Sequence, residues 1–174
     1  LSTNLASTQV SRITKLEISE LSCGKAKSVH QPFSCVLGPG DSLLIDAPSG
    51  TGKTTLLDTL AGLRPALSGS VQVCGERCEL YGNSEWQKQV GYISQHPELI
   101  YGSLHDNLSL GRSFSTAELW QALKQAQLDE LVKQLPQQLE HFISDSGDFL
   151  SGGQIQRLSI ARALLHKPAL LLLD

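Results

Sequence analysis

Residues 47–55 constrain what this chain can fold into more than any other part of the sequence. They read Ala47-Pro48-Ser49-Gly50-Thr51-Gly52-Lys53-Thr54-Thr55 and follow the apolar run Leu43-Leu44-Ile45. The apolar run predicts a strand over residues 43–46 that is buried on both faces, and the glycine-bearing stretch predicts a tight loop with a helix starting at Lys53. Such a loop turns its backbone N–H groups inward, and the helix adds the positive end of its dipole. Together they form a site for an anion.

The loop fits the phosphate-binding pattern G-x-x-x-x-G-K-[ST] at every fixed position except the first, where the chain has Ala47. In this pattern the lysine reaches the outer phosphates of a nucleotide, and the hydroxyl after it is a ligand of Mg²⁺. An ordinary turn rich in Ser, Thr and Gly is the alternative, and the strand before the loop and the Lys-Thr pair disfavour it. Since alanine tolerates positive φ poorly, Ala47 is expected to avoid it or to be strained. The expected nucleotide-binding residues are Ser49, Gly50, Thr51, Gly52, Lys53, Thr54 and Thr55.

Length and composition indicate one soluble globular domain. The chain has 174 residues, of which 40% are hydrophobic and 18% charged, and its net charge of −3 offers no basic surface for a nucleic acid. No stretch approaches the roughly 20 apolar residues that span a bilayer, and the N-terminus has no signal-peptide pattern. A role at a membrane would therefore require another domain or chain. The cysteines and histidines lack metal-ligand spacing, so we assign them no metal and expect the cysteines to be reduced.

Predicted strands alternate with predicted helices along the chain, which indicates an α/β fold with a largely parallel sheet. The residues before them, 1–11, are small, polar and uncharged, as in a linker. A capping box of Ser115 and Glu118 begins an amphipathic helix that Pro136 stops, so this helix is expected over residues 115–135. The strands are expected near residues 13–21, 33–37, 43–46, 70–74, 90–94 and 169–174, and the other helices after Lys53 and after Ser151.

Three further features fit a site beside the loop. Asp174 ends a strand of four leucines, where its carboxylate would hold Mg²⁺ directly or through water. Gln95 ends the predicted strand 90–94, where its amide would contact Mg²⁺ or the attacking water. The third feature, Ser151-Gly152-Gly153-Gln154, precedes a helix and offers a hydroxyl, glycine amides and a helix dipole to a second anion. Its alternative is a serine-capped helix start, for which two glycines are an unfavourable choice.

In these motifs, residues 12–174 resemble the nucleotide-binding domain of ATP-binding-cassette (ABC) ATPases. By that resemblance residues 47–55 are the Walker A loop, Gln95 is the Q-loop glutamine, residues 150–154 are the signature motif and residues 170–174 the Walker B strand. The resemblance implies a P-loop NTPase (RecA-like) fold, with a mostly parallel sheet, an N-terminal antiparallel β subdomain and a helical subdomain at about 96–154.

The resemblance also implies roles for these residues, with ATP and Mg²⁺ as the ligands. It makes Lys53, Gln95 and Asp174 catalytic and makes Thr54, Gln95 and Asp174 the metal ligands. In the family two such domains dimerise head to tail, as homodimers or heterodimers. Each ATP is then held by the Walker A loop of one domain and by the signature motif of the other. The residues that would serve the partner's nucleotide here are Ser151, Gly152, Gly153 and Gln154.

Within the family the sequence looks like the exporter branch, on the basis of Gly91–Pro97 and Gly102–Leu108. Leu135-Pro136 and Asp145-Ser146-Gly147 stand where exporters have Leu-Pro and the X-loop Glu-Arg-Gly. The exporter resemblance implies a transmembrane transporter domain as partner and a place on the cytoplasmic face of the inner (plasma) membrane. Trp86 and the 103–108 segment are also similar to bacterial thiol exporters needed for cytochrome bd assembly.

The chain departs from the family pattern in two further places. The aromatic residue that usually stacks on adenine is absent from Cys23-Gly24-Lys25, and Tyr81 and Tyr92 lie too far along the chain to replace it. The sequence ends at Asp174, so the family's general-base Glu and switch His are not in it, and we expect a truncated domain with little turnover. A degenerate, non-hydrolysing half of a heterodimer is the alternative. A soluble ABC protein of DNA repair or translation is disfavoured, since no coiled-coil insert or tandem cassette is seen.

Overall fold

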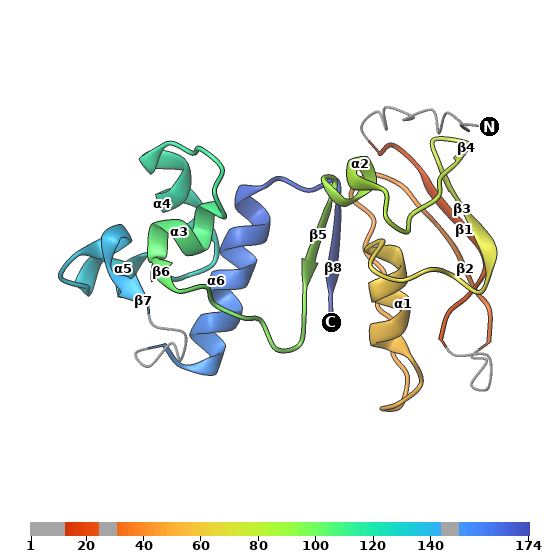
Figure 1. Cartoon of the computed structure of the whole chain (residues 1–174), viewed down its shortest axis with the longest axis horizontal. Helices are drawn as coiled ribbons and strands as arrows, with labels where there is room; N and C mark the ends of the chain where they lie inside the picture. The colour runs from red at the N-terminus through yellow and green to blue at the C-terminus, as the bar shows by residue number, and fades with distance from the viewer. Residues whose placement is uncertain (1–12, 25–30, 144–149) are drawn as a thin grey trace, which may run out of the picture. The chain divides into compact units, whose positions relative to one another are not determined.

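The computed structural model describes residues 13–24, 31–143 and 150–174 and divides into two compact units. One unit comprises the chain up to Gly91 together with Asp174, and the other comprises Tyr92–Leu173 (Figure 1). The predicted linker 1–11 and the X-loop residues Asp145-Ser146-Gly147 lie outside the described residues. Each unit is described by itself.

The first unit contains a four-stranded antiparallel sheet in the order β2-β1-β3-β4. Its strands are β1 (Leu16–Ser22), β2 (Phe33–Leu37), β3 (Ser68–Val73) and β4 (Glu76–Arg77). Alternate side chains of β1 and β3 point into the core, where Leu16, Ile18 and Val71 are buried. This sheet is the N-terminal antiparallel β subdomain that the resemblance implies.

Helix α1 (Lys53–Leu60) begins where the sequence predicts, and its far end is held by a buried tryptophan. Trp86 lies in α2 (Ser84–Gln87), is fully buried, and donates from Nε1 to the carbonyl of Leu60 at 2.7 Å. Gly62 ends the helix with φ 76°, and a Cβ there would lie 2.5 Å from the Leu80 carbonyl oxygen. These contacts fix the C-terminal end of α1 and so the position of its N-terminal turn.

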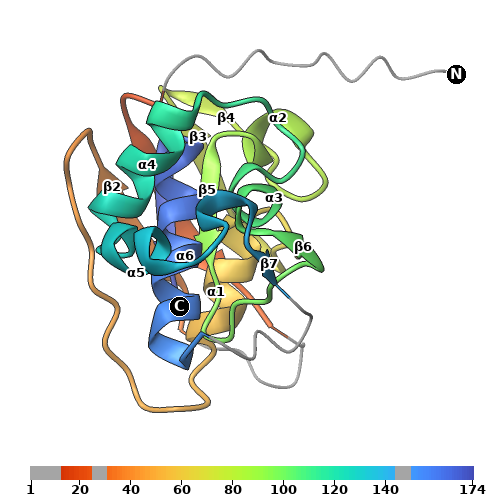
Figure 2. The same ribbon diagram turned by 90° about the vertical axis from the view of Figure 1, so that its left-hand side faces the viewer.

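The predicted strand at residues 43–46 is wrong. Residues 41–48 have no regular structure, and Leu44 is 89% exposed (Figure 2). A strand buried on both faces needs hydrogen-bonded neighbours and covering layers. The edge strands of the sheet described in this unit are β2 and β4, and residues 43–46 pair with neither of them. Leu43 and Leu44 therefore stay exposed. The turn before it forms as predicted, with the Gly38 N–H donating to Asp41 Oδ2 at 2.8 Å.

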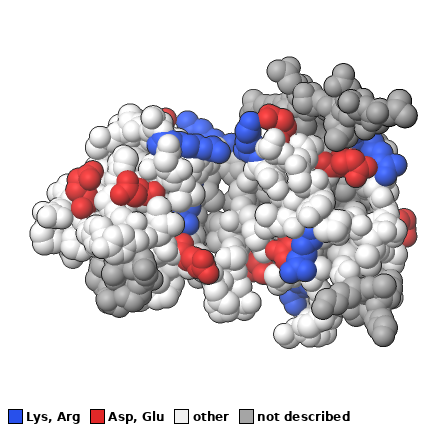
Figure 3. Space-filling view, viewed as in Figure 1, with Lys and Arg blue, Asp and Glu red and all other residues white. Residues whose placement is uncertain are grey.

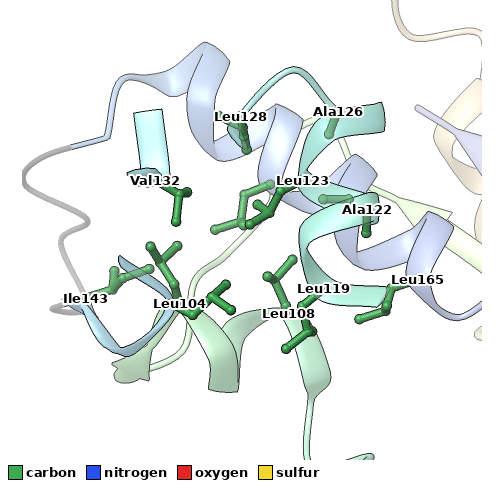
Figure 4. Close-up of a cluster of buried hydrophobic side chains, with 13 residues drawn as sticks. Leu104, Leu108, Leu119, Ala122, Leu123, Ala126, Leu128, Val132, Ile143 and Leu165 are labelled. Atoms are coloured by element: carbon green, nitrogen blue, oxygen red, sulfur yellow. The ribbon is translucent and has the colours of Figure 1, made fainter. Parts of the chain in front are cut away.

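The second unit is mainly helical, as the resemblance implies. Its core is formed mainly by apolar side chains of its helices, with Leu108 and Leu123 fully buried (Figure 4). The elements from β5 to the end of the chain are β5 (Val90–Ile93), β6 (Gly102–Ser103), α3 (Leu104–Ser109), α4 (Thr116–Gln125), α5 (Asp129–Gln134), the 3₁₀ helix η1 (Gln138–Glu140), β7 (Phe142–Ile143), α6 (Gly152–Leu165) and β8 (Leu170–Leu173).

The single helix predicted over residues 115–135 is wrong, because two helices occupy the segment. The Ser115–Glu118 capping box is confirmed, but α4 ends at Gln125 and Gln127 has φ 57°. The next N–H, that of Leu128, donates back to the Leu123 carbonyl at 2.9 Å. A left-handed residue followed by a buried apolar one is a common helix ending. The break lets Leu128 join the same core as α4.

Strand β8 forms where predicted but is not buried throughout. It pairs with β5 alone among the described strands, and Figure 1 shows the two arrows pointing the same way. Leu172 is buried, whereas Leu173 is 61% exposed. The reason is that a two-stranded sheet leaves one face uncovered, so side chains alternate between core and solvent.

Within the described residues, no helix is both long enough and apolar enough to span a bilayer.

Candidate nucleotide-binding site

The loop of residues 47–52 has the backbone of an anion cradle. Gly50 and Gly52 have φ of 83° and 90°, a left-handed conformation that side chains with a Cβ rarely adopt. The Thr51 hydroxyl donates to the Pro48 carbonyl at 2.8 Å and closes the turn. Ala47 is not among the described residues with positive φ, so it avoids positive φ, as expected.

The N-terminal turn of α1 carries no cap from a side chain. Its N-cap residue is Gly52, no side chain accepts from the first turn, and that turn has no acidic residue. By contrast, Ser115 and Glu118 cap α4. The first four N–H groups of an α-helix lack an intrahelical acceptor, and the helix dipole makes this end positive. The start of α1 therefore fits a phosphate group.

Lys53 folds back over the loop that precedes it. Its Nζ donates to the carbonyl of Ala47 at 2.5 Å and to that of Pro48 at 3.1 Å. An ammonium group has three donors, so these two carbonyls leave one for another acceptor. The sequence pattern did not point to these carbonyls, because a main-chain acceptor has no residue signature.

Thr54 and Asp174 meet although they lie 120 positions apart. Thr54 Oγ1 donates to Asp174 Oδ2 at 2.8 Å, beside the N-terminal turn of α1. Hydroxyl and carboxylate oxygens suit Mg²⁺, which typically takes one or two protein oxygens together with phosphates and water. The described residues contain no group of three or more His, Cys, Asp or Glu that could hold a metal. The donor set therefore fits an ion that is shared with a nucleotide.

Gln95 lies in the second unit, two residues after the end of β5, and its side chain is exposed. Thr54 and Asp174 belong to the first unit. The role of Gln95 at the metal therefore stays a prediction.

Residues 151–154 form the start of α6. Ser151 is the N-cap: its Oγ accepts from the Gln154 N–H at 3.3 Å, and Gln154 Oε1 accepts from the Ser151 N–H at 2.7 Å. The alternative of a serine-capped helix start is thus correct as far as the cap goes. The Ser151 hydroxyl keeps its own proton, which an anion can accept.

Gly152 and Gly153 are not required by the fold of this chain. Neither has a positive φ, and among the described residues a Cβ on either would meet nothing within 4 Å. Glycine is less favourable than alanine in a helix by about 1 kcal/mol per residue. Two glycines at this turn leave the backbone open to close approach by another molecule.

The adenine side of the site has no aromatic residue at the expected place. Cys23 is buried, and burial raises the pKa of its thiol. Gly24 follows, and Lys25 lies outside the described residues. Tyr81 is exposed on the loop after β4, and Tyr92 lies in the second unit.

Comparison with known proteins gives the same family as the sequence motifs. Residues 31–174 match the ABC transporter family. The chain is 40% identical over 136 residues to the uncharacterized ABC transporter ATP-binding protein YwjA of Bacillus subtilis, covering 78% of this chain and 24% of that protein. It is 38% identical over 142 residues to the mycobactin import ATP-binding/permease protein IrtB of Mycolicibacterium thermoresistibile, covering 81% of this chain and 24% of that protein.

Two further similarities extend the comparison. A multidrug resistance ABC transporter ATP-binding and permease protein of Lactococcus lactis subsp. cremoris is 33% identical, over 78% of this chain and 23% of that protein. Among solved structures, a bacterial Atm1-family ABC exporter with ATP bound superposes with a TM-score of 0.88 at 25% identity, over all of this chain and 31% of that chain. The chain thus spans about a quarter of the length of these curated relatives.

Proposed function

Since the chain belongs to the ABC transporter family, as a nucleotide-binding domain of the exporter type, we propose that it is the ATP-binding and ATP-hydrolysing module of a longer exporter. The observation that carries this proposal is the contact between Thr54 and Asp174 beside the uncapped start of α1. It joins a hydroxyl and a carboxylate at the start of α1, to which the helix dipole, the loop amides and the lysine also belong. Residues 12–174 would form the domain, with 1–11 as linker and about 96–154 as helical subdomain.

The catalytic task of such a site is to position phosphates and to balance their charge. The loop amides and Lys53 bind the outer phosphates, for which Lys53 uses the donor that its two loop carbonyls leave. Thr54, Asp174 and Gln95 hold Mg²⁺, which when bound neutralises charge on the phosphates. Gln95 also orients the attacking water.

A second copy of such a domain completes the site in this proposal. Nothing in the described part of the chain requires glycine at residues 152 and 153, which supports close approach by a phosphate group to their backbone. Ser151 donates its hydroxyl proton, and the start of α6 supplies the dipole. Ser151–Gln154 would bind the γ-phosphate of ATP held by the other domain, in a head-to-tail homodimer or heterodimer.

The second unit also presents an apolar surface that suits a transmembrane partner. Tyr101 and Phe142 pack edge to face with ring centroids 4.6 Å apart, and they are 69% and 49% exposed. Ile100 beside Tyr101 is also exposed. Clustered exposed aromatics are typical of protein contacts. We assign this docking surface, Ile100, Tyr101 and Phe142, to the transmembrane domain at the cytoplasmic face of the membrane.

Substitution of Lys53 tests the assignment. In the full-length transporter reconstituted in liposomes, Lys53→Ala is expected to lower the ATPase rate by about 100-fold or more, because removing one preorganised charge contact typically costs this much. Lys124→Ala removes an exposed lysine of α4 and serves as the matched control. An unchanged ATPase rate and Mg·ATP affinity in Lys53→Ala would show that this loop is not the phosphate site.

A degenerate half of a heterodimer is the second candidate, favoured by Ala47 in the loop and by the absence of an aromatic at Cys23-Gly24. Under it, full-length protein that binds Mg·ATP would show no turnover without its partner half. Export of a small thiol remains a proposal from the similarity of residues 103–108. Trp86 adds nothing to it, because its hydrogen bond to Leu60 explains why it is there.

A further inference from the structure

Asn107, near the end of α3, is fully buried and uses its whole amide on nearby groups. Its Oδ1 accepts from the Ile100 N–H at 2.9 Å, and its Nδ2 donates to the carbonyls of Ile100 at 2.8 Å and Ser103 at 3.0 Å. The side chain thus bonds both main-chain groups of Ile100, as a neighbouring strand would. It holds the course of the segment that carries Ile100 and Tyr101.

Arg162 ties this segment to α6. Its Nε donates to the main-chain carbonyl of Asn107 at 2.7 Å, and Nη2 lies 3.3 Å from Asn107 Oδ1. Nη1 reaches the carbonyl of Glu98 at 3.3 Å. A guanidinium group is rigid and planar, so its three hydrogen bonds to Asn107 and Glu98 fix its orientation. One residue of α6 is therefore joined to both ends of the segment 98–107.

The network links the docking surface to the helix α6, and the proposed function uses both. The segment 98–107 carries Ile100 and Tyr101 of the docking surface, and α6 begins with Ser151, Gly152 and Gly153. Apolar packing also joins α3 to α6, through Leu104, Leu108 and Leu158. Buried polar networks with every group satisfied set a single arrangement, which apolar contacts alone do not.

We propose that Asn107 and Arg162 are positioning residues that make the docking surface and α6 move as one body. When the transmembrane partner displaces Tyr101, the phosphate-binding turn Ser151–Gly153 then moves with it, because the segment between them does not deform. This inference rests on the proposed function, because it gives the docking surface its effect on hydrolysis.

A double-mutant cycle in the full-length transporter in liposomes tests it. Tyr101→Ala alone is expected to lower the ATPase kcat severalfold. In the background of Asn107→Leu, which keeps the side-chain size and removes all amide bonds, Tyr101→Ala is expected to have an effect smaller by at least about threefold, as coupled residues show. Arg162→Lys, which keeps the charge and loses the fork, is a second background with the same expectation.

The control background is Val132→Ala, a buried residue of α5 in the same core but outside the network. There Tyr101→Ala should keep its full effect, since loss of packing alone does not break the link. If Tyr101→Ala lowers the ATPase kcat by the same factor in the Asn107→Leu and Arg162→Lys backgrounds as in the wild type, the positioning role is wrong. No effect of Tyr101→Ala in the wild type would overturn the docking surface and this inference with it, while the Lys53→Ala result still decides the nucleotide site.

Discussion

At the scale of single residues, the site depends on side chains whose partners lie far along the chain. Lys53 bonds carbonyls of its own loop, but Thr54 meets a residue 120 positions away, at the end of β8. No local sequence pattern predicts either contact. The phosphate-binding pattern predicted the residue types, and the structure supplies the neighbours that make a carboxylate available to Thr54.

His166, after α6, gives a pH-dependent stability. Burial lowers the pKa of its imidazole, and the positive charges of Arg112 and Arg162 lower it further, whereas a hydrogen bond with the Leu108 backbone opposes the shift. A lowered pKa means that the unfolded chain binds the proton more readily. The stability contribution is therefore complete above the ordinary histidine pKa of 6.5 and is lost as the pH falls below it.

The expected result is a free energy of unfolding that decreases between pH 7.5 and 5.5, measured by urea denaturation of this chain. His166→Gln, which is neutral at both pH values, should have a shallower decrease over the same range. His105→Gln is the control, since His105 is partly exposed beside Asp106. Equal slopes for His166→Gln and the wild type would contradict the pKa assignment.

At the scale of elements, local signals predicted best. The start of α1 at Lys53, the capping box of α4 and the start of α6 at residues 151–152 each depend on a few neighbouring residues, and all three are found. The missed features depend on distant partners. Residues 43–46 lack a strand to pair with, and the break at Gln127 occurs where the sequence has neither Gly nor Asn to mark it.

Gly153 separates the structural from the functional account of the start of α6. Gly153→Ala is expected to keep or raise the stability of the chain, by up to about 1 kcal/mol, because alanine favours helices and space is open. The ATPase rate of the full-length transporter should fall by tenfold or more if a phosphate approaches this backbone. Gln156→Ala on the same helix is the control. Unchanged turnover in Gly153→Ala would remove these residues from the nucleotide site.

At the scale of the whole molecule, the composition predicts no basic surface for a nucleic acid. Acidic and basic side chains are interspersed on the face shown in Figure 3, in keeping with a net charge of −3. The antiparallel subdomain and the helical unit could be expected from the resemblance, as could the family itself. The relation of Gln95 and residues 151–154 to a bound nucleotide could not, because under the proposed function it depends on the substrate and, for residues 151–154, also on a second domain.

The central claim is that two separate segments of this chain bind ATP. Hydrogen exchange of the full-length transporter, with and without Mg·ATP, tests it directly. Amide groups of residues 50–55 and of residues 151–154 are both expected to exchange more slowly with nucleotide, because both helix starts would donate to phosphates. Lys53→Ala should abolish both effects. Equal exchange at 50–55 with and without Mg·ATP would contradict the account.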